Sequence, residues 1–460
     1  MIDGAAVLAE AIAAGAISAA ETVDACLAAI ESVNGELNAV VQAVPDRARA
    51  EAIAADERLA AGDDVGPLHG VPVTIKDCFA TEGIVTTVGT TGLASFVPDE
   101  DDVTVARLRR AGAIVVGKTN CPELLMGFES DNLVYGRTVN PFDSARTCGG
   151  SSGGEAAIVA AGASPLGLGS DSGGSLRVPA HFCGIPTLKP THGRVPITSA
   201  VFPSTGPFSR LRAVGTLAPT VDDLVLGLRV LAGPDGRDPW AAPVPLPDPA
   251  GVDVGALRVA VYADDDVGPA TPETVAAVEV AGVALEKAGA AVEAALLPVA
   301  NEAIELYTGI LGGDGGAGLR RVLEAVGTTE PSPLIANMLA LVSANVQPAS
   351  QYADTLARWD RFRLRAMEFL DDYDVILSPV AAVPALAHGT TFEHLNAFGY
   401  VFTHNLTGWP AAVVRAGTSP EGLPIGVQIA AAPWREDRAL AVARRLESAL
   451  GPFSPPTIAA

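Results

Sequence analysis

Two short stretches rich in serine and glycine have the composition for nucleophilic chemistry. GGSSGG occupies residues 149–154, and SDSGGS occupies residues 170–175. Glycine removes side chains and permits backbone angles that other residues avoid, so such a loop can expose a serine hydroxyl. A serine hydroxyl must lose a proton to attack a carbonyl carbon. The chemistry therefore needs a base, and histidine or lysine is the candidate.

A histidine base would belong to the nucleophile-elbow pattern G-x-S-x-G, which fits around Ser151 and again around Ser152. That elbow is a sharp turn from a strand into a helix. A helix is predicted after the motif, but NPFDSART before it is typical of a loop. An α/β-hydrolase-type esterase with a Ser/His/acid triad stays open as an alternative, with the downstream histidines as candidates: His388, His394 and His404.

A lysine base is available at Lys76, which closes the predicted strand 71–76. Lysine accepts a proton only when it is neutral, and burial lowers its pKa. A lysine at a strand end more often extends its ammonium group into solvent, so Lys76 alone identifies nothing. Lys118 is the last residue but one of GAIVVGKT, residues 112–119, which matches the Walker A pattern. Its apolar middle predicts a strand rather than a phosphate-binding loop, which argues against nucleotide binding.

Strands and helices alternate along the chain. Helices are predicted over 46–59, 101–111 and 156–163, and strands over 113–117 and 165–169. A Ser18/Glu21 capping box marks an earlier helix start. This alternation predicts an α/β fold, an α/β/α sandwich around a large, twisted, mostly parallel (mixed) sheet. We expect a single domain over 1–460, made of N-terminal helices (1–62), a catalytic core (66–232), a proline-rich connection (233–256), a more variable part with a possible lid (257–370, the lid within 305–350) and C-terminal core strands with a helix (371–460).

The lysine strand and the two serine loops together resemble the amidase signature family. Residues 149–191 are similar to that family's defining segment almost throughout, and GVPVTIKD at 70–77 is similar to its lysine motif. GKTNCPELLMGFESDN at 117–132 and the C-terminal NLTGWPAAVV and GLPIGVQI resemble its flanking blocks. The resemblance covers most of the chain and is weakest across 235–370.

The resemblance implies a role for each of three residues. Ser175 matches the acylated nucleophile, Ser151 matches a bridging serine whose peptide bond with Gly150 is cis, and Lys76 matches the base. In such a triad Ser151 relays the proton to a neutral Lys76 and later delivers it to the leaving amine. No metal and no cofactor is needed.

The loop before the nucleophile is expected to form an oxyanion hole. Consecutive backbone N–H groups can meet one oxygen there: Ser172, Gly173, Gly174 and Ser175. Asp171 and Arg177 are expected to brace this loop.

The family match also suggests a substrate pocket, with Leu125, Met126, Gly127, Phe128 and Phe202 as its lining. These residues are largely apolar. We therefore expect hydrolysis of hydrophobic or aryl amides, with esters and aryl carbamates (urethanes) as further substrates. The family also contains the glutaminase (A-type) subunit of a tRNA-dependent amidotransferase, which is the main alternative. That subunit usually reads RQPAAFCG after the nucleophile, whereas this chain has RVPAHFCG at 177–184, departing at Val178 and His181.

Composition narrows the partners. The net charge of −23 repels nucleic acid phosphates and anionic membranes, so neither is an expected partner, and the family resemblance implies a small-molecule amide or carbamate as the partner. The five cysteines form no CxxC pair and are expected to be reduced and mostly buried. The N-terminus lacks the pattern of a secretory signal, and we expect a cytoplasmic monomer or homodimer.

Overall fold

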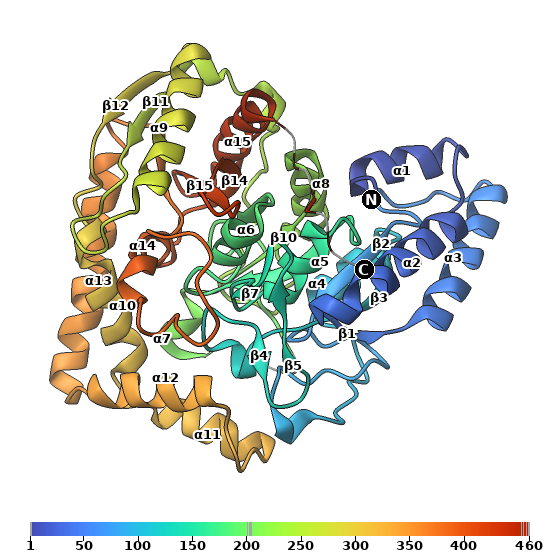
Figure 1. The fold of residues 1–460 in the computed structure, drawn as a ribbon, viewed down its shortest axis with the longest axis horizontal. Coiled ribbons are helices and arrows are strands. Elements are labelled where there is room, and N and C mark those ends of the chain that lie inside the picture. The colour runs from blue at the N-terminus through green and yellow to red at the C-terminus, as the bar shows by residue number, and fades with distance from the viewer. Residues whose placement is uncertain are drawn as a thin grey trace.

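An eleven-stranded sheet runs through the chain (Figure 1). The computed structural model describes residues 2–199, 201, 205–451, 453, 455, 456 and 458, so the predicted pocket residue Phe202 lies outside the described residues. Across the sheet the strands follow the order β1 (Val40–Ala43), β3 (Ile114–Thr119), β2 (Pro72–Lys76), β8 (Gly167–Asp171), β10 (Ala213–Leu217), β9 (Thr187–Lys189), β14 (Ala411–Thr418), β15 (Pro424–Ala431), β13 (Val375–Pro379), β11 (Arg258–Val261) and β12 (Ala291–Ala294).

The α/β class is confirmed, but the sheet is less parallel than expected. β3, β2 and β8 are parallel to one another, as are β13, β11 and β12. The pairs between these two groups, and the pair of β1 with β3, are antiparallel. Two small ribbons lie outside the sheet, formed by β4 (Asp131–Asn132) with β5 (Gly136–Arg137) and by β6 (Val139–Asn140) with β7 (Asp143–Thr147).

Helices cover both faces of the sheet, as the predicted sandwich requires. Along β14, Val413 packs into one apolar cluster while Ala412 and Val414 pack into another, because successive strand residues point to opposite faces. One cluster includes residues of α2 (Ala19–Leu37), α3 (Pro45–Ala60), α5 (Gly153–Ala160), α6 (Arg177–Cys183), α10 (Ala303–Gly312), α13 (Ala349–Phe369) and α14 (Gly399–Thr407). The other includes residues of α1 (Ala5–Ala13), α4 (Val103–Arg110), α8 (Val221–Leu231), α9 (Pro272–Lys287) and α15 (Glu436–Leu450).

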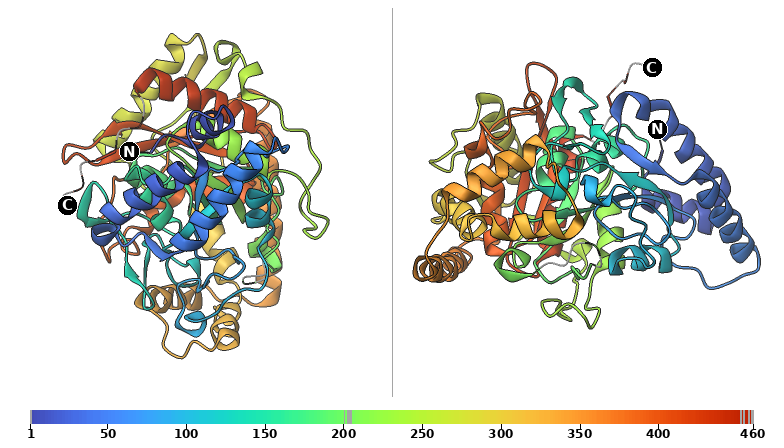
Figure 2. Two further views of the ribbon diagram at one scale, coloured as in Figure 1. Left: turned by 90° about the vertical axis from the view of Figure 1, so that its right-hand side faces the viewer. Right: turned by 90° about the horizontal axis from the view of Figure 1, so that it is seen from below.

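Three more helices complete the half of the molecule that lies away from the N-terminal helices. They are α7 (Gly206–Ser209), α11 (Ala317–Val326) and α12 (Pro333–Ala344). Figure 1 shows α1–α3 on one side and α10–α13 on the other, and the view from below in Figure 2 agrees. The proline-rich connection 233–256 contains only the 3-10 turns η3 (Pro249–Gly251) and η4 (Val254–Ala256).

Several local predictions can be compared with the structure directly. The Ser18/Glu21 capping box is present at the start of α2. All five cysteines are free and buried. Among the described residues, no helix is long and apolar enough to cross a membrane.

The parallel strands β3, β2 and β8 determine where chemistry can occur. Carboxyl ends of parallel strands meet at one edge of a sheet. Lys76 is the last residue of β2, and the SDSGGS loop leaves the end of β8. The segment after β3 runs from residue 120 through the short 3-10 helix η2 (Glu123–Leu125). Three stretches that are distant in the sequence therefore meet at this edge.

Candidate active site

Lys76 is fully buried among hydroxyl groups. Its Nζ forms hydrogen bonds with Ser151 Oγ at 2.7 Å, with Ser152 Oγ at 3.0 Å and with Ser170 Oγ at 3.2 Å. Burial lowers the pKa of Lys76 and outweighs the opposing effects of two nearby cysteine thiols and of Asp171, while the positive charge of Arg212 lowers that pKa further. Within the described part of the chain, no carboxylate forms an ion pair with this lysine. Its surroundings therefore favour the neutral amine.

The serine loops meet at the lysine from two directions. The Gly150–Ser151 peptide bond is cis, which confirms that prediction. The Ser152 N–H donates to the Ser175 carbonyl at 3.0 Å and joins the two loops. Ser175 lies beside Ser151 in the lining of one cavity, but no hydrogen bond joins their hydroxyls in the described structure. The sequence therefore located the cluster, while the Ser175–Ser151 contact is not made in this conformation.

Asp171 and Arg177 brace the loop that carries Ser175. The Asp171 carboxylate accepts the Arg177 Nε–H at 3.0 Å and Nη2–H at 3.1 Å, and both side chains are fully buried. It also accepts the Gly174 N–H at 2.8 Å and the Leu176 N–H at 3.1 Å. Burial by itself would raise the pKa of Asp171, but the Arg177 guanidinium and the hydrogen bonds outweigh burial and hold it well below its usual range.

This brace corrects the predicted oxyanion hole at one position. The Gly174 N–H is used by Asp171, so it is not available to a substrate oxygen. The glycine remains necessary because its φ of 109° lies in the left-handed region that side chains disfavour. The N–H groups of Ser172, Gly173 and Ser175 have no acceptor among the described residues.

The carboxyl group of Glu155 is fully buried near the strand that carries Lys76. Glu155, on α5, accepts the Thr74 Oγ1–H at 2.6 Å and the Thr119 Oγ1–H at 2.8 Å. Burial raises the pKa of Glu155 to about 8. Because Thr74 belongs to β2 and Thr119 to β3, this side chain ties the helix after GGSSGG to the strand that carries Lys76.

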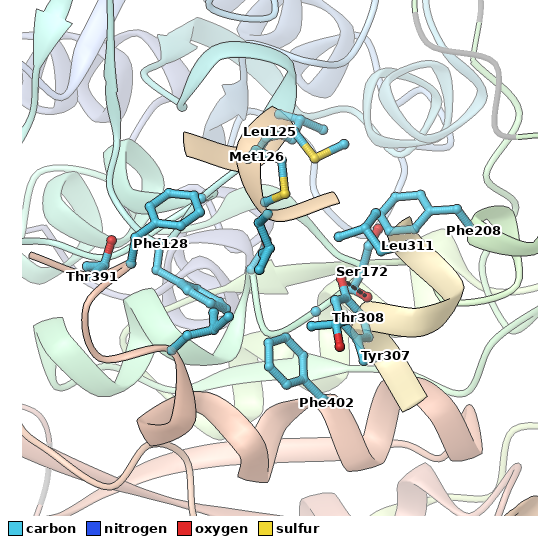
Figure 3. A pocket seen from close by; sticks show the side chains of 17 residues that line it. Leu125, Met126, Phe128, Ser172, Phe208, Tyr307, Thr308, Leu311, Thr391 and Phe402 are labelled. Carbon is cyan, nitrogen blue, oxygen red and sulfur yellow. Dashed lines mark hydrogen bonds between the residues drawn. The ribbon is translucent and has the colours of Figure 1, made fainter. Parts of the chain in front are cut away.

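An apolar pocket opens beside Ser175. Leu125, Met126, Gly127 and Phe128 line it as the sequence predicted. Figure 3 shows Leu125 and Met126 on one side of this space and Tyr307 and Phe402 on the other. The rest of the lining comes from Ser172, Gly173, Phe208, Thr308, Leu311, Met338, Leu341, Thr391, Phe392 and Leu395.

Sequence reasoning missed most of these walls. Tyr307 and Phe402 are stacked with their ring centroids 4.2 Å apart, and the Tyr307 hydroxyl donates to the Ser172 carbonyl at 3.3 Å. Their apolar pattern was typical of ordinary core helices, so no sequence signal separated them from core residues. A wider cavity of about 760 Å³ adjoins the pocket and contacts Ser151, Ser175 and α10–α12.

The structure supports neither the histidine triad nor the Walker A interpretation. His388 contacts the Ser144 carbonyl, and His404 is buried on α14 with no hydrogen-bond partner among the described residues. Among the described residues no hydrogen bond joins a histidine to the serine loops, so the Ser/His/acid triad of the alternative is not formed. The Walker-like stretch is strand β3, and Lys118 is buried against the Phe79 carbonyl and Asp77.

The two departures from the amidotransferase segment do not reach the pocket. Val178 packs beside Gly174, and His181 contacts the Val383 carbonyl and the Gly426 N–H. Both residues are fully buried on α6. They therefore carry little information about substrate.

A buried lysine hydrogen-bonded to serines beside an apolar pocket is the arrangement of hydrolases that activate serine with lysine. The family model described as Amidase matches residues 21–440. The chain belongs to the amidase signature family and is an amidase-family enzyme.

The relatives include more than one kind of family member. The chain is 35% identical to the A-type subunit of the glutamyl-tRNA(Gln) amidotransferase of Chloroflexus aggregans, over 94% of this chain and 93% of that protein. It is 36% identical to the indoleacetamide hydrolase of Bradyrhizobium diazoefficiens, over 96% of this chain and 86% of that protein. The solved structure of a fatty acid amide hydrolase matches with a TM-score of 0.89 and 25% identity, over 97% of this chain and 85% of that chain.

Proposed function

We propose that this enzyme hydrolyses amides whose acyl group is apolar or aromatic, with esters and aryl carbamates as further substrates. The observation that carries the proposal is the apolar pocket beside Ser175, in which aromatic and aliphatic side chains predominate. An acyl group in this pocket places its carbonyl carbon next to the Ser175 hydroxyl.

In the acylation step, Ser175 Oγ forms a bond to the carbonyl carbon. Its proton passes to Ser151 Oγ as the Ser151 proton passes to Lys76 Nζ. A neutral amine has two N–H donors and one lone pair, and three hydroxyls surround Lys76. Ser151, at the shortest distance, supplies the hydrogen bond to that lone pair. The developing oxyanion accepts hydrogen bonds from the free N–H groups of Ser172, Gly173 and Ser175.

The tetrahedral intermediate then collapses. The C–N bond breaks, the leaving nitrogen takes a proton from Ser151, and Lys76 returns its proton to Ser151. Water attacks the acyl-enzyme by the same route in reverse, which releases the carboxylic acid and restores Ser175. In each half-reaction the proton that Lys76 takes up during attack is returned when the tetrahedral intermediate collapses, so Lys76 is neutral again at the end of both.

A second candidate is the glutaminase subunit of a tRNA-dependent amidotransferase. Sequence similarity favours it, because several of the similar proteins carry that name, among them those of Chloroflexus aggregans and Anaeromyxobacter dehalogenans. The pocket favours the first candidate, because glutamine carries an ammonium and a carboxylate that need charged or polar partners. The lining of the apolar pocket contains no charged side chain among the described residues, whereas Arg212, Asp314 and Arg321 line the wider cavity that adjoins it.

One panel of substrates separates the two functions. The purified chain is assayed alone on acyl anilides, aryl carbamates, primary amides and glutamine. Release of aniline without a partner protein supports the hydrolase. Activity on glutamine alone, or dependence on added partner proteins, refutes it. Ser175→Ala is the control, and we expect it to abolish turnover while leaving the circular dichroism spectrum unchanged.

A further inference from the structure

Two buried carboxylates flank the segment that forms one side of the acyl pocket. Glu123 precedes Leu125 and Met126, and Glu129 follows Phe128. The exposed fractions of Glu123 and Glu129 are 1% and 3%. Neither carboxylate forms an ion pair within the described ranges, and neither contacts the serines or Lys76. Burial of a carboxylate is costly unless hydrogen bonds compensate for it, so their partners indicate what they do.

Glu123 holds the wall formed by α12. It accepts the Ser332 N–H at 2.6 Å, and Ser332 is the N-cap residue of that helix. It also accepts the Thr90 Oγ1–H at 2.7 Å, and Thr90 contacts the Thr328 hydroxyl at 2.5 Å. Thr328 lies in the connection between α11 and α12, so both ends of that connection are tied to one carboxylate.

Glu129 holds a second wall of the pocket, which is the loop around residue 391. Its carboxylate accepts the Gly389 N–H at 2.8 Å, the Thr391 N–H at 3.3 Å and the Thr391 Oγ1–H at 2.9 Å. Thr391 and Phe392 line the pocket directly. All these donors are neutral, and hydrogen bonds to a charged acceptor are the stronger kind.

The two walls meet over Gly127. A Cβ atom at this glycine would lie 3.8 Å from Leu334 Cδ1 on α12 and 3.8 Å from Phe392 Cε2 on the loop. The segment between the carboxylates therefore forms the side against which both walls close. Figure 3 places Thr391 across the pocket from Ser172, so displacement of the loop around Thr391 would change the pocket at a distance from the Ser175 loop.

We propose that Glu123 and Glu129 are positioning residues that set the depth of the acyl pocket, and so the length of acyl group that the enzyme prefers. This inference rests on the proposed function. A short acyl group contacts the pocket near Ser175, and a long one extends to the two walls. Loss of either carboxylate should therefore weaken catalysis on long acyl groups more than on short ones.

The experiment compares Glu123→Gln and Glu129→Gln with the wild-type enzyme on acetyl, butyryl and octanoyl anilides. The glutamine side chain keeps the size but turns one acceptor oxygen into a donor that faces other donors. We expect kcat/KM for the octanoyl substrate to fall about tenfold more than for the acetyl substrate, mainly through KM. The matched controls are the exposed neighbours Glu330→Gln, close to Ser332, and Glu393→Gln, close to Phe392.

A merely structural role would lower turnover of all acyl lengths together, and equal losses on acetyl and octanoyl substrates overturn the proposal. If the glutamine variants fold poorly by thermal melting, Thr391→Val removes one donor to Glu129 and leaves the carboxylate in place. We then expect the same dependence on chain length, with a smaller effect. Unchanged chain-length preference in a folded Thr391→Val enzyme also overturns it.

Failure of the proposed function can be told apart with ethyl and octyl fluorophosphonates. Here the Ser175 hydroxyl displaces fluoride from phosphorus and its proton leaves with the fluoride, so amide cleavage is not required. A wild-type preference for one chain length that is lost in Glu123→Gln supports the inference even if no anilide is hydrolysed. Equal labelling rates for both chains in the wild-type enzyme overturn it.

Discussion

Replacement of Asp171 by asparagine should reveal how firmly the nucleophile loop is held. The substitution keeps the shape of the side chain but removes the charge opposite Arg177. Both partners are fully buried, and the guanidinium would keep its bonds to the Gln428 and Asn405 side-chain oxygens and to the Val401 carbonyl. Removal of one partner from a buried ion pair costs about 3–5 kcal/mol, because it leaves the other charge uncompensated.

We therefore expect Asp171→Asn to lower the free energy of unfolding by about 3–5 kcal/mol at pH 7. The assay is urea denaturation followed by circular dichroism. The matched control is Asp248→Asn, which breaks the exposed pair with Arg229 (2.9 Å) and should lower the free energy of unfolding far less than Asp171→Asn. Arg177→Met added to Asp171→Asn should recover part of the loss, because it removes the unpaired charge.

The same pair predicts a pH dependence. Since the pKa of Asp171 is lowered in the folded state, its contribution is complete above its ordinary value near 4 and is lost as the pH falls below that value. The stability gap between wild type and Asp171→Asn should stay constant from pH 7 to about 5 and narrow at lower pH. A variant within about 1 kcal/mol of the wild type at pH 7 would refute the reasoning.

Three further predictions follow from buried groups near the site. Lys76→Arg, which stays charged, should be inactive, and an arginine variant with activity near that of the wild type contradicts a base role for Lys76. The kcat/KM of the wild type should rise with pH through the lowered pKa of Lys76 and then level off. Glu155→Gln should gain stability relative to the wild type as the pH rises from 5 to 8, by about 1.4 kcal/mol per pH unit, because the folded wild type keeps a proton that its unfolded chain releases. Urea titrations at both pH values measure the difference in free energy of unfolding, and a difference that does not change with pH contradicts the prediction. Native protein at pH 8 should resist iodoacetamide until urea unfolds it, because all five thiols are buried, and rapid native alkylation counted by mass spectrometry would contradict this.

The sequence predicted those parts of the fold that depend on local pattern. The apolar runs that form β2 and β3 were recognisable because a strand buried on both faces consists mostly of apolar residues. Helix α5 begins at Gly153, three residues before the predicted start. The prediction placed the start too late because glycine has a low helix propensity. Strand direction was not predictable in the C-terminal half, since an apolar run such as β15 has the same composition in parallel and antiparallel pairs.

The cluster of side chains around Lys76 was likewise predicted only in part from the sequence. Lys76, Ser151 and Ser175 came from motifs, but Ser152 and Ser170 did not, although both hydroxyls contact the lysine amine. Their role depends on the approach of two loops that only the folded sheet brings together. The use of the Gly174 N–H by Asp171 is likewise a matter of loop geometry, and no residue pattern specifies it.

The residues proposed to carry out the chemistry and those proposed to select the substrate come from different parts of the chain. Lys76 and the serine loops lie at one edge of three parallel strands, held by Asp171, Arg177 and Glu155. The outer pocket walls come instead from 303–344 and 389–402, and the first of these stretches falls where the family resemblance is weakest. A glutaminase and a stand-alone hydrolase could share the first set of residues and differ in the second. Similarity over the whole chain is therefore common to both functions, and an exchange of α10–α12 between this chain and an amidotransferase glutaminase should transfer substrate preference while leaving the proposed catalytic serines in place.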